Sequence, residues 1–145
     1  MFKNRNTLYA YVAGIIDGEG SISLTRNHNC KEFRYPSIHV PSTSYELMDL
    51  LKKEFGGWIC TKKLYKENHK QSWSWSLSYN NAIQFLEKIH KYLVIKEKRR
   101  RANLIIQRYK EVTPRNGQYT PELYKAKKAF EKEFHKNGGA EGTPT

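Results

Sequence analysis

The feature of the sequence that most constrains its fold is the stretch LYAYVAGIIDGEGSISL, residues 8–24. Its first part carries apolar and small residues at helical spacing, and its last part alternates polar and apolar residues as a half-buried strand does. Two carboxylates, Asp17 and Glu19, lie among three glycines at the junction. Because the C-terminus of a helix already carries partial negative charge, acids there are disfavoured unless a cation compensates them. The stretch therefore predicts a helix that leads directly into a strand, with chemistry at the two acids.

The composition indicates one compact unit and a polyanionic partner. A chain of 145 residues is long enough for one domain with a real core. Its 26 Lys and Arg against 14 Asp and Glu give a formal charge of +12, which favours nucleic acid over a merely basic soluble protein. The sequence has no apolar run of membrane-spanning length and no signal peptide features, so we expect a soluble, intracellular protein without a membrane partner. Cys30 and Cys60 are expected to be reduced thiols.

Hydrophobic periodicity predicts helices and strands in the order helix, two strands, helix, two strands, helices. We expect an α+β fold of the order αββαββα, in which helices cover one face of a four-stranded antiparallel sheet and the other face is polar. Residues 1–112 should form the core, 113–136 a turn and a C-terminal helix, and 137–145 a disordered tail. The first expected helix is 6–17, capped by Asn6 or Thr7. The second lies within 42–57, is opened by Ser42 or Ser44, buries Leu47, Leu50, Leu51 and Phe55, and is closed by Gly56. The remaining helices are expected at 81–91, 95–111 and 121–136, and the strands within 21–25, 31–40, 58–68 and 71–80.

Small residues form a stripe along the first predicted helix. Ala10, Gly14 and Gly18 are four residues apart, with Ala13 beside them. A stripe without side-chain bulk allows a second helix to approach closely. That helix could belong to the same chain, or it could be the same helix of a second subunit related by a two-fold axis.

The segment VAGIIDGEG, residues 12–20, resembles the signature motif of the LAGLIDADG homing endonucleases. It keeps the alanine, the glycine, the first acid and both later glycines of the motif, and it has Glu19 where the family most often has aspartate. Glutamate is an oxygen ligand of the same charge. VPSTSYELMDLLKKEFGGWI is similar to the second helix and third strand of the family, and YLVIKEK, residues 92–98, is similar to its conserved lysine segment.

The resemblance implies a double-strand DNA endonuclease of a mobile intron or intein. Since the chain has one motif, it would act as a homodimer that cuts a long, roughly palindromic target. Hydrolysis would depend on Mg2+ or another divalent cation such as Mn2+, and Ca2+ would support binding without efficient cleavage. The implied interface residues are Ala10, Ala13, Gly14 and Asp17, the last of them as a structural cap.

The resemblance also implies roles for individual polar residues. Glu19 would be the metal ligand, helped by the backbone carbonyl of Gly18. Lys96, which follows an apolar triplet, would stabilise charge at the scissile phosphate, with Lys98 as the alternative. Ser42 at the end of the second strand would position water or phosphate, although a helix N-cap explains this serine equally well.

DNA contacts are expected on the open, polar face of the sheet, because a ribbon of strands can enter the major groove. On the first strand, the residues an even number of positions after Glu19 are expected on the same face as Glu19. On the second strand, the polar residues are selected. The hairpin contributes lysines, and the sequence does not determine which face of the sheet they lie on. Trp73 and Trp75 alternate with serines at the same two-residue period as Leu77, so they are expected in the core rather than stacked on bases. The selected residues are Ser21, Ser23, Thr25, Asn27, Tyr35, Ser37, His39, Lys62, Lys63 and Lys66.

Two other functions fit the same architecture. An RNA-binding maturase would use the basic sheet on intron RNA, and a DNA-binding regulator would use it without cutting. Loss of the acids would favour either function, and Glu19 is present. The sequence HNC at 28–30 lacks companion ligands for a histidine metal nuclease, so His28 is expected to be a loop residue.

Overall fold

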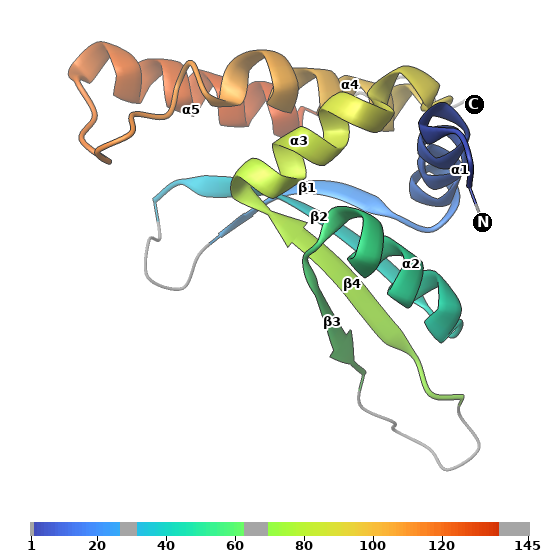
Figure 1. Ribbon diagram of the computed structural model, residues 1–145. Coiled ribbons are helices and arrows are strands. Elements are labelled where there is room, and N and C mark those ends of the chain that lie inside the picture. Colours follow the sequence, from blue (N-terminus) through green and yellow to red (C-terminus); the bar gives the residue numbers. More distant parts are fainter. Residues whose placement is uncertain (1, 27–31, 63–69, 137–145) are drawn as a thin grey trace, which may run out of the picture.

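The computed structural model describes residues 2–26, 32–62 and 70–136 (Figure 1). The observed order confirms the predicted α+β fold. Asn27, Cys30, Lys63, Lys66 and the tail 137–145 lie outside the described residues. The elements are α1 (Arg5–Gly18), β1 (Ser21–Arg26), β2 (Arg34–Ser42), α2 (Tyr45–Phe55), β3 (Trp58–Thr61), β4 (Trp73–Ser78), α3 (Tyr79–Ile89), the 3-10 turn η1 (His90–Tyr92), α4 (Lys96–Leu104), the π-helical turn η2 (Ile105–Tyr109) and α5 (Pro121–His135).

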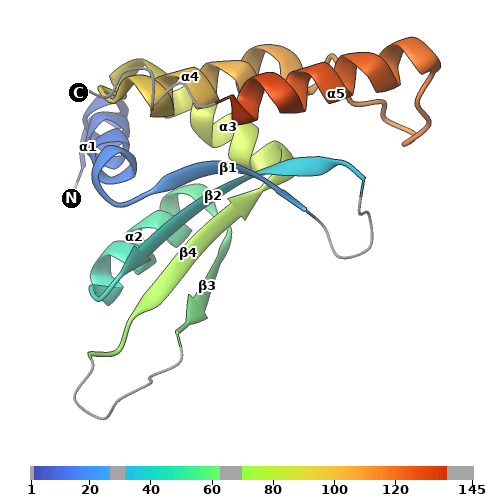
Figure 2. The ribbon, with the colours of Figure 1, turned by 180° about the vertical axis from the view of Figure 1, so that it is seen from behind.

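The four strands form one antiparallel sheet in the order β1-β2-β4-β3. Ile22, Ile38 and Leu77 lie side by side across three strands and are fully buried under the helices. Seen from behind in Figure 2, the strands lie in front of α2, so the opposite face of the sheet is left open. In the described part of the chain, no helix is both long and apolar enough to span a membrane.

The start of α1 differs from the prediction, whereas α2 starts at one of its two predicted residues. Asn4, not Asn6 or Thr7, caps α1, and its side chain accepts a hydrogen bond from the Asn6 N–H at 2.7 Å. Asn4 has extended backbone dihedrals, as an N-cap requires, and helical dihedrals begin at Arg5. At α2 the N-cap residue is Ser44, whose N–H donates to the Ser42 hydroxyl at 2.9 Å.

The buried stripe of α2 was predicted only in part. Met48 and Leu51 are fully buried and form its centre. The other three predicted core residues, Leu47, Leu50 and Phe55, are half-buried and pack at its edges. Met48 and Leu51 are three residues apart, so they share the face that lies directly over the sheet.

Two strand ends were also predicted incorrectly. The strand β2 continues through Pro41 to Ser42. Proline is tolerated at this position because β1 pairs with β2 only as far as His39, so no hydrogen bond to β1 is lost through the absent N–H of Pro41. Tyr79 does not continue β4 but begins α3, with a left-handed φ of 55°.

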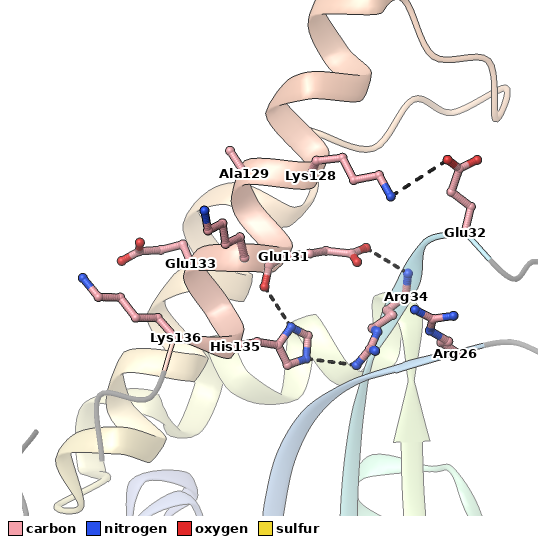
Figure 3. A pocket seen from close by; sticks show the side chains of 10 residues that line it. Arg26, Glu32, Arg34, Lys128, Ala129, Glu131, Glu133, His135 and Lys136 are labelled. Carbon is pink, nitrogen blue, oxygen red and sulfur yellow. Dashed lines mark hydrogen bonds and ion pairs between the residues drawn. The ribbon is translucent and has the colours of Figure 1, made fainter. Parts of the chain in front are cut away.

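The C-terminal helix α5 is fixed to β2 by polar contacts (Figure 3). The Glu131 carboxylate accepts the Arg34 backbone N–H at 3.0 Å, and the Arg34 guanidinium donates to His135 Nε2 at 3.1 Å. At the end of α5, the Arg100 side chain of α4 donates to the carbonyls of Glu133, Phe134 and Lys136, each at 2.9 Å. These contacts join α5 to the helical layer on the far side from the open face.

Candidate metal and nucleic-acid site

The junction between α1 and β1 places Glu19 on the surface. Glu19 follows the last helical residue, and its backbone N–H donates to the Ile15 carbonyl at 2.8 Å. Gly20 is buried, and a Cβ there would lie 2.7 Å from Ile16 Cδ1 and 2.9 Å from Ile16 Cα, so only glycine fits. The close approach allows the chain to pass from helix to strand at once and leaves the Glu19 side chain exposed.

Asp17 has a different environment from Glu19. Its carboxylate accepts the backbone N–H of Val94 at 2.9 Å and that of Ile95 at 3.2 Å. Ile95 is the N-cap residue of α4, where the partial positive charge of the helix stabilises an anion. Both oxygens of Asp17 are therefore occupied by the start of α4, and Glu19 is the acid that remains available to a ligand.

Lys98 supplies the cation that the end of α1 requires. Its ammonium donates to the carbonyls of Ile16 and Asp17, both at 2.6 Å. Burial lowers the pKa of Lys98, and the charges of Asp17 and Glu19 act in the opposite direction. Lys96 is the first residue of α4 and is exposed. The structure thus brings Lys98, rather than the preferred candidate Lys96, to the two acids.

An open pocket of about 320 Å³ lies beside Glu19 and is lined by Glu19, Pro41, Ser42, Thr43 and Ser72. Its polar side chains all carry oxygen, which is the donor type that Mg2+ and Ca2+ prefer. The described residues contain no group of three or more His, Cys, Asp or Glu arranged so that it could hold a metal ion. A divalent cation at Glu19 would therefore take the rest of its coordination from water or from the oxygens of a second molecule, as Mg2+ commonly does.

Sequence reasoning did not identify Thr43 and Ser72 as part of this pocket. Ser72 lies immediately before β4, which pairs with the end of β2 through Ser42 and Trp73. Its position depends on strand pairing across the hairpin, and the register of that hairpin was open at the sequence level.

The strand register places six of the predicted contact residues, those of β1 and β2, on the open face. The cross-strand pairs Ser21–His39, Ser23–Ser37 and Thr25–Tyr35 alternate with the buried pair Ile22–Ile38. The hydroxyls of Thr25 and Ser37 are hydrogen-bonded at 2.5 Å on this face. The outer face consists of Ser21, Ser23, Thr25, Tyr35, Ser37, His39, Pro41, Trp58, Cys60, Ser74, Ser76 and Ser78. None of these described residues has a carboxylate side chain.

The strand register also shows which residues of β3 face outward. Trp58 pairs with Ser76 and Cys60 with Ser74, so these residues of β3 belong to the outer face, although the sequence prediction did not select them. His39 lies centrally, 3.3 Å from the Ser76 hydroxyl. Burial lowers the pKa of His39, and the positive charge of Lys62 lowers it further.

The exposed side of α1 carries the small-residue stripe. Ala10, Gly14 and Gly18 are exposed, and a Cβ built on either glycine meets nothing within 4 Å. Ala13 is fully buried in the core of its own chain, so its prediction as an interface residue is wrong. It shares the inward face of α1 with Val12 and Ile16, whereas Ala10 and Gly14 lie on the outward face.

Apolar side chains extend this exposed side of α1. Tyr11 is 45% exposed, and Val94 and Ile95, whose N–H groups bind Asp17, are 77% and 43% exposed. Exposed apolar residues next to one another favour an association surface.

Comparison with known proteins shows the same architecture. The family model described as LAGLIDADG endonuclease matches residues 12–110. No curated protein sequence gives a significant match. The fold is similar to that of the homing endonuclease I-CvuI in complex with its target in the presence of Ca, with 20% identity and a TM-score of 0.67 over 90% of this chain and 81% of that chain.

Two further structures share the fold. The LAGLIDADG homing endonuclease I-SmaMI bound to cleaved DNA is 18% identical with a TM-score of 0.62, and the match covers 90% of this chain and 44% of that one. The homing endonuclease I-TnaI is 17% identical with a TM-score of 0.52, and the match covers 92% and 91%. This chain thus corresponds to less than half of the I-SmaMI chain and to most of I-CvuI and I-TnaI.

Proposed function

The chain belongs to the LAGLIDADG endonuclease family, and from that premise we propose that it is a site-specific double-strand DNA endonuclease, of intron or intein type, that acts as a homodimer. The observation that carries the proposal is the position of Glu19, which is exposed at the edge of a polar, acid-free sheet face and faces an oxygen-lined pocket. The partner is inferred from this surface and from the DNA complexes of I-CvuI and I-SmaMI. The target would be long and roughly palindromic.

The cleavage chemistry divides among a few side chains. Glu19 and the backbone carbonyl of Gly18 would hold Mg2+ or Mn2+, and the Ser42 hydroxyl would orient water or a phosphate oxygen. A divalent cation in this position supplies Lewis acidity to an attacking water and to the leaving oxygen. The Lys98 ammonium has three N–H donors, of which two bind the end of α1, so one is left for a phosphate oxygen.

Dimerisation follows from the number of available acids. One chain presents Glu19 alone to the pocket, whereas cutting two strands requires a site for each strand. Packing two copies of α1 through Ala10 and Gly14 would bring both Glu19 residues together, with Val94 and Ile95 covered at the rim. Two helix C-termini would then meet, and the Lys98 ammonium of each subunit would reduce their repulsion.

The outer face is suited to reading base edges. Ser21, Ser23 and Thr25 of β1 and Tyr35, Ser37 and His39 of β2 present small hydrogen-bonding groups at a two-residue period. Such groups pair with donors and acceptors in the major groove. Lys62 would add a phosphate contact beside His39, and the same role is proposed for Lys63 and Lys66.

The proposal is tested by incubating the protein and Mg2+ with a randomised DNA library and sequencing the cut ends. The expected result is a consensus with approximate two-fold symmetry around the cut, which disappears when EDTA removes the metal. Cut ends without a consensus would contradict site specificity. Binding without any cutting in Mg2+ would favour the regulator, and tighter binding of intron RNA than of DNA would favour the maturase.

Replacing Lys98 by Gln should reduce cleavage by about a hundredfold or more, which is the typical loss when one donor to a developing negative charge is removed. DNA binding should change much less. Lys96→Gln is the matched control, because Lys96 is exposed and lies only two residues away. Single-turnover cleavage and DNA affinity would be measured for both variants, with thermal unfolding to register the two lost carbonyl contacts. If Lys96→Gln lost more activity than Lys98→Gln, the assignment would be reversed.

DNA binding should depend steeply on salt. Neutralising six or more phosphates predicts a loss of affinity of about a thousandfold between about 50 and 200 mM salt, because bound counterions are released. Preference for the target over a random duplex should persist across this range, since base contacts carry it. A gel-shift series on both duplexes checks this, and an affinity that stays constant with salt would count against contacts to phosphate.

A further inference from the structure

A second pocket lies at the opposite end of the sheet from Glu19. It has a volume of about 650 Å³ and is lined by Tyr79 and Asn80 at the start of α3 and by Tyr109, Lys110, Thr113 and Arg115 after α4. In Figure 1 the segment that follows α4 turns beside the start of β2. Tyr35 lies at the start of β2, and Ser42, which lines the pocket beside Glu19, lies at its end. The two residues are seven positions apart, which is roughly 23 Å at the rise of an extended strand.

The pocket is continuous with the outer face through two stacked rings. The Tyr79 ring lies on that of Tyr35, with centroids 4.4 Å apart and planes inclined by 11°, and Tyr35 belongs to the outer face. Tyr79 is 45% exposed. An aromatic residue with a φ of 55° is unfavourable, and strain of this kind is concentrated at functional positions.

The side chains that line the pocket include two cations. Lys110 and Arg115 are exposed, and no carboxylate is among the lining residues. Behind the lining lies Lys127, which is 1% exposed, donates to the Thr113 hydroxyl and lies 4.1 Å from the centre of the Tyr109 ring. Burial raises the pKa of Tyr109 to about 12, so its phenol adds no negative charge at neutral pH.

We propose that this pocket binds the sugar-phosphate backbone of DNA that flanks the sequence contacted by the sheet. Lys110 and Arg115 contact the phosphates, and the exposed edge of Tyr79 packs against a sugar. The pocket lining carries positive charge and no carboxylate, it exposes an aromatic ring, and it is continuous with the outer face. These features fit a polyanion that runs along the sheet and beyond its end. This inference rests on the proposed function, because it assumes that DNA lies on the outer face.

The test uses the double variant Lys110→Gln/Arg115→Gln. The matched control is Lys52→Gln/Lys88→Gln, which removes the same charge from exposed positions on α2 and α3. The probes are two duplexes of the target recovered from the library: a short one that ends at the last specified base pair, and a long one with an additional helical turn on each side. The affinity of each protein for each duplex is measured as a function of salt.

For the wild type and the control, we expect the long duplex to bind about tenfold more tightly, with a salt slope steeper by about 1.8 per subunit for two added phosphate contacts. The double variant should bind the short duplex as the wild type does and should lose both differences. A double variant that keeps the preference for the long duplex would overturn the inference, as would one that weakens binding to both duplexes equally. If the wild type bound neither duplex, the proposed function itself would be overturned.

Discussion

Replacing Glu19 by Gln is expected to reduce DNA cleavage by about a thousandfold or more while DNA binding persists. The substitution keeps the shape of the side chain and removes the charge that, in the proposed mechanism, would hold a divalent cation. Loss of the several kcal/mol that such a cation contributes corresponds to a loss of three or more powers of ten in rate. Binding should be unchanged or tighter, because each subunit presents one negative charge fewer to the phosphates. The wild type in Ca2+ should behave similarly, with binding but little cutting.

Binding and cleavage should be measured together on one recovered target. Glu87→Gln is the matched control, since it makes the same charge change at an exposed position on α3. The control should cut at the wild-type rate. A Glu19→Gln variant that cuts nearly as fast as the wild type would remove Glu19 from the chemistry, and a variant that loses binding as well would assign Glu19 a structural role.

Replacing Gly14 by Leu is expected to abolish dimerisation and, with it, double-strand cleavage. A Cβ at Gly14 meets nothing within 4 Å in the single chain, so the leucine disturbs only a partner that approaches from outside. The monomer should become more stable by up to about 1 kcal/mol, because glycine is unfavourable in a helix interior. Weakened assembly together with a stabilised monomer is a result that misfolding does not produce.

Sedimentation, thermal unfolding and cleavage would be compared for Gly14→Leu and for Lys88→Leu, which adds the same side chain to an exposed site on α3. Lys88→Leu should sediment and cut as the wild type does. If Gly14→Leu remained dimeric and active, the surface formed by Ala10 and Gly14 would not be the interface.

Local patterns predicted the fold well because each element carries its own periodicity. The junction at Asp17 and Glu19, the two-residue alternation in β4 and the glycine after α2 are all short-range signals. They were sufficient for the order of elements and for the outer-face residues of β1 and β2. Pairing between distant strands is not encoded in this way, so the register of β3 and the pocket position of Ser72 required the structure.

Within the site, sequence and structure differ where tertiary contacts decide between neighbouring residues. Ala10 and Ala13 are both small and lie on the same helix, and only the packing of α1 shows that Ala13 is buried. Lys96 and Lys98 have the same chemistry, and the point at which α4 starts determines which ammonium reaches the end of α1. In the sequence, Tyr79 continues the alternating pattern of β4. In the structure the chain turns into α3 at Tyr79, whose ring stacks on Tyr35, and hydrophobic periodicity does not reveal this turn.

In the proposed mechanism, Glu19 holds the divalent cation of the reaction. Calorimetric titration of Ca2+ into the complex of the protein with its recovered DNA target tests this claim without the complication of cleavage. The wild type should show saturable Ca2+ binding, and Glu19→Gln, bound to the same DNA, should show little or none. Equal Ca2+ affinity and stoichiometry for the two proteins would contradict the claim.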